Sequence, residues 1–127
     1  MLRHLNADIL IVDDTISNLE ILTTVLTDQG YQVQSATNGN IALQVIQNKQ
    51  PDLILLDIMM PEMSGYEVCQ RLKEDPQTTH IPVIFISALH ELVDLQKAFD
   101  VGGADFITKP FLIEELLVKI KYQLLMK

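Results

Sequence analysis

The sequence predicts an α/β fold in which a five-stranded parallel sheet is doubly wound, with five helices on its two faces. Three short runs, 9–12, 53–56 and 83–86, are apolar at consecutive positions. This pattern is typical of strands that are covered on both faces, as in a parallel sheet flanked by helices. Segments with apolar residues three and four positions apart fill the gaps, so strand and helix alternate five times along the chain.

The order of the strands follows from their composition. Two further runs, 32–36 and 105–108, are partly polar and suit the edges of the sheet, where one side meets solvent. Three buried strands between two edge strands, joined by right-handed crossovers, predict the order 2-1-3-4-5. The expected elements are strand 9–12, helix 19–26, strand 32–36, helix 42–46, strand 53–56, helix 66–73, strand 83–86, helix 92–99, strand 105–108 and helix 113–124.

Length and charge limit the classes of protein to consider. The chain has 127 residues, 48% of them apolar, which is enough for one hydrophobic core. The expected elements fill this length, so we expect one domain over residues 1–127 and no output domain. Its 9 Lys and Arg against 17 Asp and Glu give a net charge of −8. That charge disfavours DNA, RNA and anionic lipid as partners.

Other features indicate a cytoplasmic protein with no membrane partner. A single cysteine, Cys69, excludes a disulfide framework and a thiolate zinc site. No apolar run approaches the roughly 18 residues that a membrane span requires. The first residues carry no long apolar stretch of the kind that a signal peptide contains.

Polar residues follow four of the five predicted strands. Asp13 and Asp14 follow the first strand, Asp57 the third, Ser87 the fourth and Lys109 the fifth. Open parallel sheets bind ligands at the carboxyl ends of their strands. We therefore expect these five side chains to lie along one rim of the sheet.

The chemistry of this group favours a cation and phosphate. Two like charges about 4 Å apart repel by roughly 4 kcal/mol at an effective dielectric of 20. A hard divalent cation relieves that repulsion, and carboxylate ligands without Cys or His favour magnesium (Mg2+). Mg2+, a lysine and a hydroxyl around a carboxylate suit phosphoryl transfer. Asp57 would then be the nucleophile and would form an acyl phosphate.

Four motifs in register resemble the receiver domain of two-component response regulators, and the resemblance covers essentially the whole chain. The same strand order occurs in flavodoxin-like proteins and in chemotaxis regulators of that family, so it is not independent support. The motifs are Ile11-Val12-Asp13-Asp14, Leu56-Asp57-Ile58-Met59-Met60-Pro61 with Met63 and Gly65, Ser87-Ala88, and Thr108-Lys109-Pro110-Phe111.

The resemblance implies a role for each residue of the rim. Asp57 accepts a phosphoryl group from a phosphohistidine of a sensor histidine kinase or a phosphotransfer protein. Asp13, Asp14, Asp57 and the backbone carbonyl of Met59 bind Mg2+. Ser87 and Lys109 contact the phosphoryl group.

The resemblance also implies a conformational output. Ser87 and Phe106 form the switch, and the surface of the fourth helix, fifth strand and fifth helix changes and can form a homodimer. Phe106 lacks the hydroxyl of the tyrosine that is common in the family, so a switch here depends on packing. The Lys109–Pro110 peptide bond is expected to be cis, which costs little before proline.

Other interpretations remain open from the sequence. Asp13 and Asp14 could be helix caps with no further role, and Phe106 could be an ordinary packing residue. A phosphatase of the haloacid dehalogenase type also uses Asp, Mg2+ and Lys, but it usually has a second acid where this chain has Met59. A flavodoxin-like flavin binder would need a loop that accepts phosphate, which Asp13 and Asp14 would repel.

Overall fold

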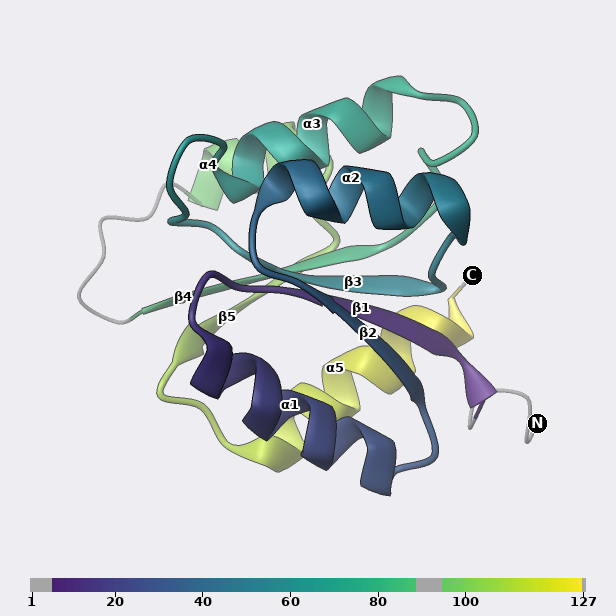
Figure 1. Cartoon of the computed structure of the whole chain (residues 1–127), viewed down its shortest axis with the longest axis vertical. Coiled ribbons are helices and arrows are strands. Elements are labelled where there is room, and N and C mark those ends of the chain that lie inside the picture. The colour runs from purple at the N-terminus through teal and green to yellow at the C-terminus, as the bar shows by residue number, and fades with distance from the viewer. Residues whose placement is uncertain (1–5, 89–94, 127) are drawn as a thin grey trace.

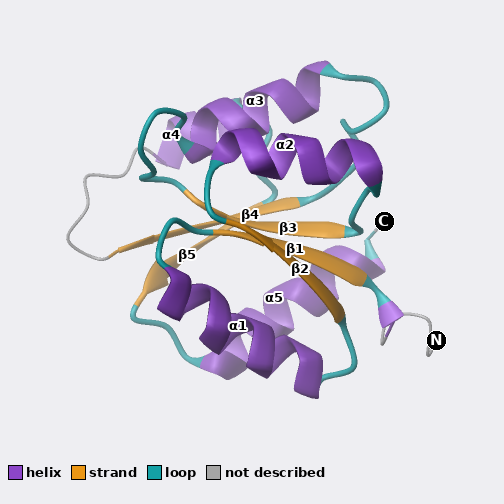
Figure 2. Cartoon of the chain, in the orientation of Figure 1, coloured by secondary structure: helices purple, strands orange, loops and turns teal. Residues whose placement is uncertain are grey.

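The computed structural model describes residues 6–88 and 95–126 as one sheet between two layers of helices (Figures 1 and 2). Five parallel strands pair in the order β2-β1-β3-β4-β5. Helices α2, α3 and α4 cover one face, and α1 and α5 cover the other. The predicted fold class is therefore confirmed. The elements are β1 (Asp8–Val12), α1 (Ile16–Asp28), β2 (Gln32–Ala36), α2 (Gly39–Asn48), β3 (Leu53–Asp57), α3 (Gly65–Glu74), β4 (Val83–Ala88), α4 (Leu95–Asp100), β5 (Asp105–Lys109) and α5 (Ile113–Leu125).

The central strands supply both hydrophobic cores of the molecule. Successive side chains of a strand point to opposite faces of the sheet. In β3, Leu53 and Leu55 belong to the core under α1 and α5, whereas Ile54 and Leu56 belong to the core under α2 and α3. All four side chains are fully buried. Burial on both faces explains why this strand is apolar at every position before Asp57.

The ends of the elements differ from the predicted ones in a way that matters for the rim. Pairing continues one or two residues further, because Asp57 pairs with Ile86 and Ala88 pairs with Lys109. Asp57, Ser87 and Lys109 are therefore the last or next-to-last residues of their strands, not loop residues. The described part of the fourth helix is α4, and the predicted part at 92–94 lies outside the described residues.

Helix α3 is fixed to its surroundings by Cys69 and Lys73. The Cys69 thiol is buried and donates to the carbonyl of Val101. Burial raises the pKa of this thiol to about 11, so it is protonated and unreactive at neutral pH. Burial also lowers the pKa of Lys73, whose ammonium group donates to the carbonyls of Thr79 and Ile81. The single cysteine is thus a core residue.

The chain between β3 and α3 turns sharply behind Asp57. The amide of Gly65 donates to the carbonyl of Ile58 at 2.8 Å. Ser64 and Glu67 form a capping box that starts α3. A Cβ atom added to Gly65 would lie 2.3 Å from the backbone oxygen of Asp57. Only glycine allows the start of α3 to lie this close to the end of β3.

We expect Gly65→Ala to lower the free energy of unfolding by about 1–3 kcal/mol, the usual cost of a forced close contact. The obstructing atom is backbone, so it cannot move aside without shifting Asp57. Urea denaturation measures the change. Gln70→Ala, on the exposed side of the same helix, is the control and should stay within about 0.5 kcal/mol of the parent chain. A Gly65→Ala chain as stable as this control would contradict the close contact.

Candidate functional site

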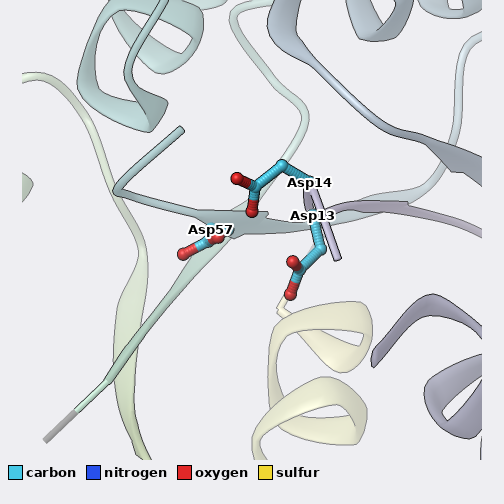
Figure 3. A group of neighbouring side chains, drawn as sticks. All are labelled: Asp13, Asp14 and Asp57. Carbon is cyan, nitrogen blue, oxygen red and sulfur yellow. The ribbon is translucent and has the colours of Figure 1, made fainter. Parts of the chain in front are cut away.

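Three carboxylates from two neighbouring strands meet at the rim of the sheet. One oxygen each of Asp13, Asp14 and Asp57 lies within 4.8 Å of the others (Figure 3). Strands β1 and β3 pair so that Val12 lies beside Leu56, which places Asp13 and Asp57 at matching ends. Asp13 and Asp57 are buried, with 3% and 6% of their surface exposed, whereas Asp14 is exposed. The sequence analysis therefore correctly predicted that these acids lie together.

Asp13 is held by three hydrogen-bond donors. Its Oδ1 accepts from the amide of Thr15 at 2.9 Å. Its Oδ2 accepts from Asn18 Nδ2 at 3.2 Å and from Lys109 Nζ at 3.3 Å. The N-cap of α1 is Thr15, so neither Asp13 nor Asp14 occupies the capping position. Asp13 is instead a buried carboxylate that neighbouring donors keep in one orientation.

Lys109 brings the one positive charge that the sequence placed at this rim. It is the last residue of β5, and its side chain is 28% exposed. Its ammonium group forms an ion pair with Asp13 at 3.3 Å. The following peptide bond, Lys109–Pro110, is cis, as the resemblance implied. The lysine thus lies at the acid group and contacts its most buried member.

Ser87 is fully buried at the end of β4, and its hydroxyl oxygen has no hydrogen-bond partner among residues 6–88 and 95–126. Buried hydroxyls in folded proteins are nearly always hydrogen-bonded. The Ser87 hydroxyl is therefore a buried donor whose capacity is unused in the described structure. The sequence predicted the position of Ser87 but not this unsatisfied state.

Met59 and Phe106 occupy the positions expected from the sequence. Met59 lies two residues after Asp57, and its side chain is 54% exposed. Phe106 pairs in register with Phe85 and packs against the core under α2, α3 and α4. That contact suits an ordinary packing residue and also a ring that can shift. Metal binding by the Met59 carbonyl and the switch role of Phe106 stay predictions.

The donor set fits a hard divalent cation. It consists of carboxylate oxygens, with neither sulfur nor imidazole, which is the ligand set that Mg2+ prefers. Three carboxylates and Lys109 leave a net charge of −2, which a divalent cation would neutralise. Within the described part of the chain, this is the only group of three acids, histidines or cysteines arranged to hold a metal ion.

Known proteins show which family has this arrangement. The family model for the response regulator receiver domain matches residues 9–121. This chain belongs to the receiver domain family of response regulators. Response regulator PleD of Caulobacter vibrioides is 45% identical to this receiver domain over 106 residues, which cover 84% of this chain and 23% of PleD. The DNA-binding dual master transcriptional regulator RpaA of Synechocystis sp. is 41% identical over 113 residues, covering 89% of this chain and 47% of RpaA.

Solved structures agree with this assignment. The signal receiver domain of a signal transduction histidine kinase from Syntrophus aciditrophicus superimposes with a TM-score of 0.86 at 38% identity, covering 93% of this chain and 89% of that one. Chemotaxis protein CheY4 of Vibrio cholerae gives a TM-score of 0.85 at 30% identity, covering 92% and 98%. The receiver domain spans about a quarter of PleD and about half of RpaA. In the described ranges, no helix has the length and apolar character needed to cross a bilayer.

One residue of the receiver site escaped the sequence analysis. Asn18 contacts Asp13, although it lies five positions further along the chain. It belongs to the first turn of α1, and side chains of a helix lean toward its N-terminus. That geometry directs Asn18 back to the end of β1. Its place in the first turn was the signal that could have identified it.

We expect Asp14→Asn to raise the free energy of unfolding by about 1 kcal/mol in buffer without divalent cations. The change removes one of three like charges, and the exposed position of Asp14 keeps the gain small. Urea denaturation at low and high salt measures it, and the gain should shrink with salt. Glu20→Gln removes an exposed negative charge from α1, outside this group of acids, and should change stability less. A destabilised Asp14→Asn chain would contradict repulsion within the group.

We expect Ser87→Ala to leave the free energy of unfolding within about 0.5 kcal/mol of the parent chain or to raise it, because its hydroxyl lacks a partner among the described residues. Thr78→Val is the matched comparison. The buried Thr78 hydroxyl donates to the carbonyl of Leu72 at 2.7 Å, so its loss should cost about 1 kcal/mol. Chemical denaturation of both variants measures the two changes in the free energy of unfolding. Equal losses would show that Ser87 has a partner in the folded protein.

Proposed function

We propose that this receiver domain accepts a phosphoryl group on Asp57 from a phosphohistidine of a sensor histidine kinase or a phosphotransfer protein, in a Mg2+-dependent reaction. The observation that supports this most directly is the meeting of Asp13, Asp14 and Asp57 at one rim. Lys109 and the unsatisfied Ser87 hydroxyl lie at the ends of the neighbouring strands. Family membership makes phosphoryl transfer the chemistry that best fits this set.

The proposed step involves the residues of the rim, Mg2+ and the phosphodonor. A carboxylate oxygen of Asp57 forms a bond to phosphorus while the phosphorus–nitrogen bond to the donor histidine breaks, and that electron pair stays on the imidazole. Mg2+, bound by Asp13, Asp14, Asp57 and the Met59 carbonyl, would offset the negative charge on the phosphoryl oxygens. Lys109 would leave Asp13 to pair with a phosphoryl oxygen.

Ser87 would complete the contacts to the phosphoryl group and start the switch. It follows Phe85 by two residues, so strand alternation directs its side chain to the face of α3 and α4. Asp57 follows Leu55 and leaves β3 on the opposite face. The end of β4 therefore has to shift for its hydroxyl to reach a phosphoryl group on Asp57. That shift is a direct route from phosphorylation to a structural change.

The surface of α4, β5 and α5 is the proposed output. Helices α4 and α5 expose several apolar side chains, which a homodimer or another protein could cover; they are Phe99, Val118, Tyr122 and Leu125. The relative RpaA is a DNA-binding regulator, and this chain spans less than half of RpaA. Direct contact of the receiver domain with nucleic acid is disfavoured by its charge of −8. The absence of a nucleic acid partner, the single-domain assignment and the cytoplasmic location stay predictions.

Incubation with acetyl phosphate and Mg2+ should add one phosphoryl group, because this small phosphodonor can react at the rim residues without a partner protein. Intact-mass spectrometry measures the adduct. Asp57→Asn should abolish it, since the amide is not a nucleophile. Asp52→Asn is the control, because Asp52 directly precedes the first residue of β3, at the end of the strand away from Asp57. The asparagine keeps an oxygen that can accept from the Asp8 amide, and this variant should still form the adduct.

Three outcomes of this experiment contradict the proposal. An adduct that persists in Asp57→Asn would place the phosphoryl group elsewhere. Rapid release of inorganic phosphate, with turnover of the donor, would favour the phosphatase interpretation. An adduct of the same yield in excess chelator would exclude a role for Mg2+.

A further inference from the structure

Asn18 and Lys109 share one oxygen of Asp13. Their nitrogen atoms lie 3.2 Å and 3.3 Å from the same Oδ2, while the amide of Thr15 binds Oδ1. Asp13 is 3% exposed, so solvent cannot replace a lost donor easily. Both side chains also line one small cavity of about 90 Å³ between α1 and the segment after β5.

The proposed function requires Lys109 to leave this oxygen. A lysine that pairs with a phosphoryl group on Asp57 cannot keep the same contact with Asp13. Asp13 would then lose one of its three donors at the moment when its orientation toward the cation matters. A buried carboxylate that loses hydrogen bonds is destabilised and can turn away.

We propose that Asn18 is a positioning residue that keeps the Asp13 carboxylate hydrogen-bonded and oriented toward Mg2+ when Lys109 moves to the phosphoryl group. This inference depends on the proposed function, because Lys109 has no reason to move without it. Asn18 touches neither phosphoryl group nor cation in this account. It acts through Asp13, as residues around metal ligands commonly do.

The chemistry of an amide suits this task. Asn18 Nδ2 donates a hydrogen bond without adding a positive charge, so it does not repel the cation as lysine or arginine would. Its backbone amide donates to the carbonyl of Thr15 in the first turn of α1, which fixes the point from which the side chain reaches back. A serine at this position is shorter, and an apolar residue has no donor.

The test is a Mg2+ titration of four chains: the parent, Asn18→Ala, Lys109→Met and the double variant. Isothermal titration calorimetry with Mg2+ alone reads binding and needs no activity. With Lys109 present, Asp13 keeps a second side-chain donor, and Asn18→Ala should weaken binding only a few-fold. With Lys109→Met, Asn18 is the last side-chain donor, and its loss should weaken binding about tenfold.

The decisive quantity is how much more Asn18→Ala weakens Mg2+ binding in the Lys109→Met chain than in the chain with Lys109. A local disturbance of α1 would weaken binding by the same factor in both backgrounds, whereas the proposal requires a loss at least about threefold larger without Lys109. Alanine favours the helix, so Asn18→Ala should fold, and its unfolding midpoint without Mg2+ checks this. Ser17→Ala, an exposed neighbour in the same turn, should bind Mg2+ like the parent. Asn18→Gln keeps the amide donor and should recover part of the affinity lost in Asn18→Ala.

The outcomes separate this inference from the proposed function. Equal losses in both backgrounds, or no loss in either, would overturn the role of Asn18 while Mg2+ binding by the parent chain stands. If the parent and Asp57→Asn gave the same absence of binding, the proposed function and this inference would both fail.

Discussion

Repulsion among three carboxylates at one rim is the constraint on which the rest of this structure depends. Asp13 and Asp57 are buried, and one lysine pairs with Asp13. Such a group persists only because the strands that carry it cannot separate: β1 and β3 are covered on both faces by the two hydrophobic cores. The stability of the sheet therefore holds these like charges in an arrangement whose repulsion a divalent cation would relieve.

The two ends of the sheet show how unusual the rim is. At the amino ends of the strands, Asp8 pairs with Lys49 at 3.6 Å and Asp105 pairs with Lys119 at 3.1 Å. Both ion pairs are partly exposed, as expected for surface ion pairs that contribute little to stability, and the nearby Asp52 carboxylate accepts from the amide of Asp8. At the carboxyl ends, acids outnumber the nearby lysine. A surplus of one sign, buried at the rim where parallel sheets bind ligands, indicates function and not stabilisation.

The sequence was sufficient to predict the fold and to predict which of its charged and hydroxyl residues lie at the rim, since both follow from the local pattern of apolar and polar residues. A strand buried on both faces needs an unbroken apolar run, and the polar residue that ends this run falls at the end of the sheet. Other features depend on packing between distant segments. The contact of Asn18 with Asp13, the unsatisfied hydroxyl of Ser87 and the close approach of Gly65 to Asp57 are set by how α1, β4 and α3 dock. No periodicity in the sequence encodes those distances.

Under the proposed function, the neighbourhood of Ser87 offers a route from the rim to β5 and α4. Ser87 lies opposite Thr108, so it is a diagonal neighbour of Phe106 on the same face of the sheet. Phe106 packs into the core that contains Ala98, the one fully buried side chain described in α4. Lys97 of α4 lies 4.9 Å from the ring of Tyr66 in α3, an exposed cation–π contact of modest strength. Through Phe106 and this shared core, the described part of α4 is the element that a shift of Ser87 would reach. Because Phe106 carries no hydroxyl, its ring can follow that shift without breaking a hydrogen bond of its own.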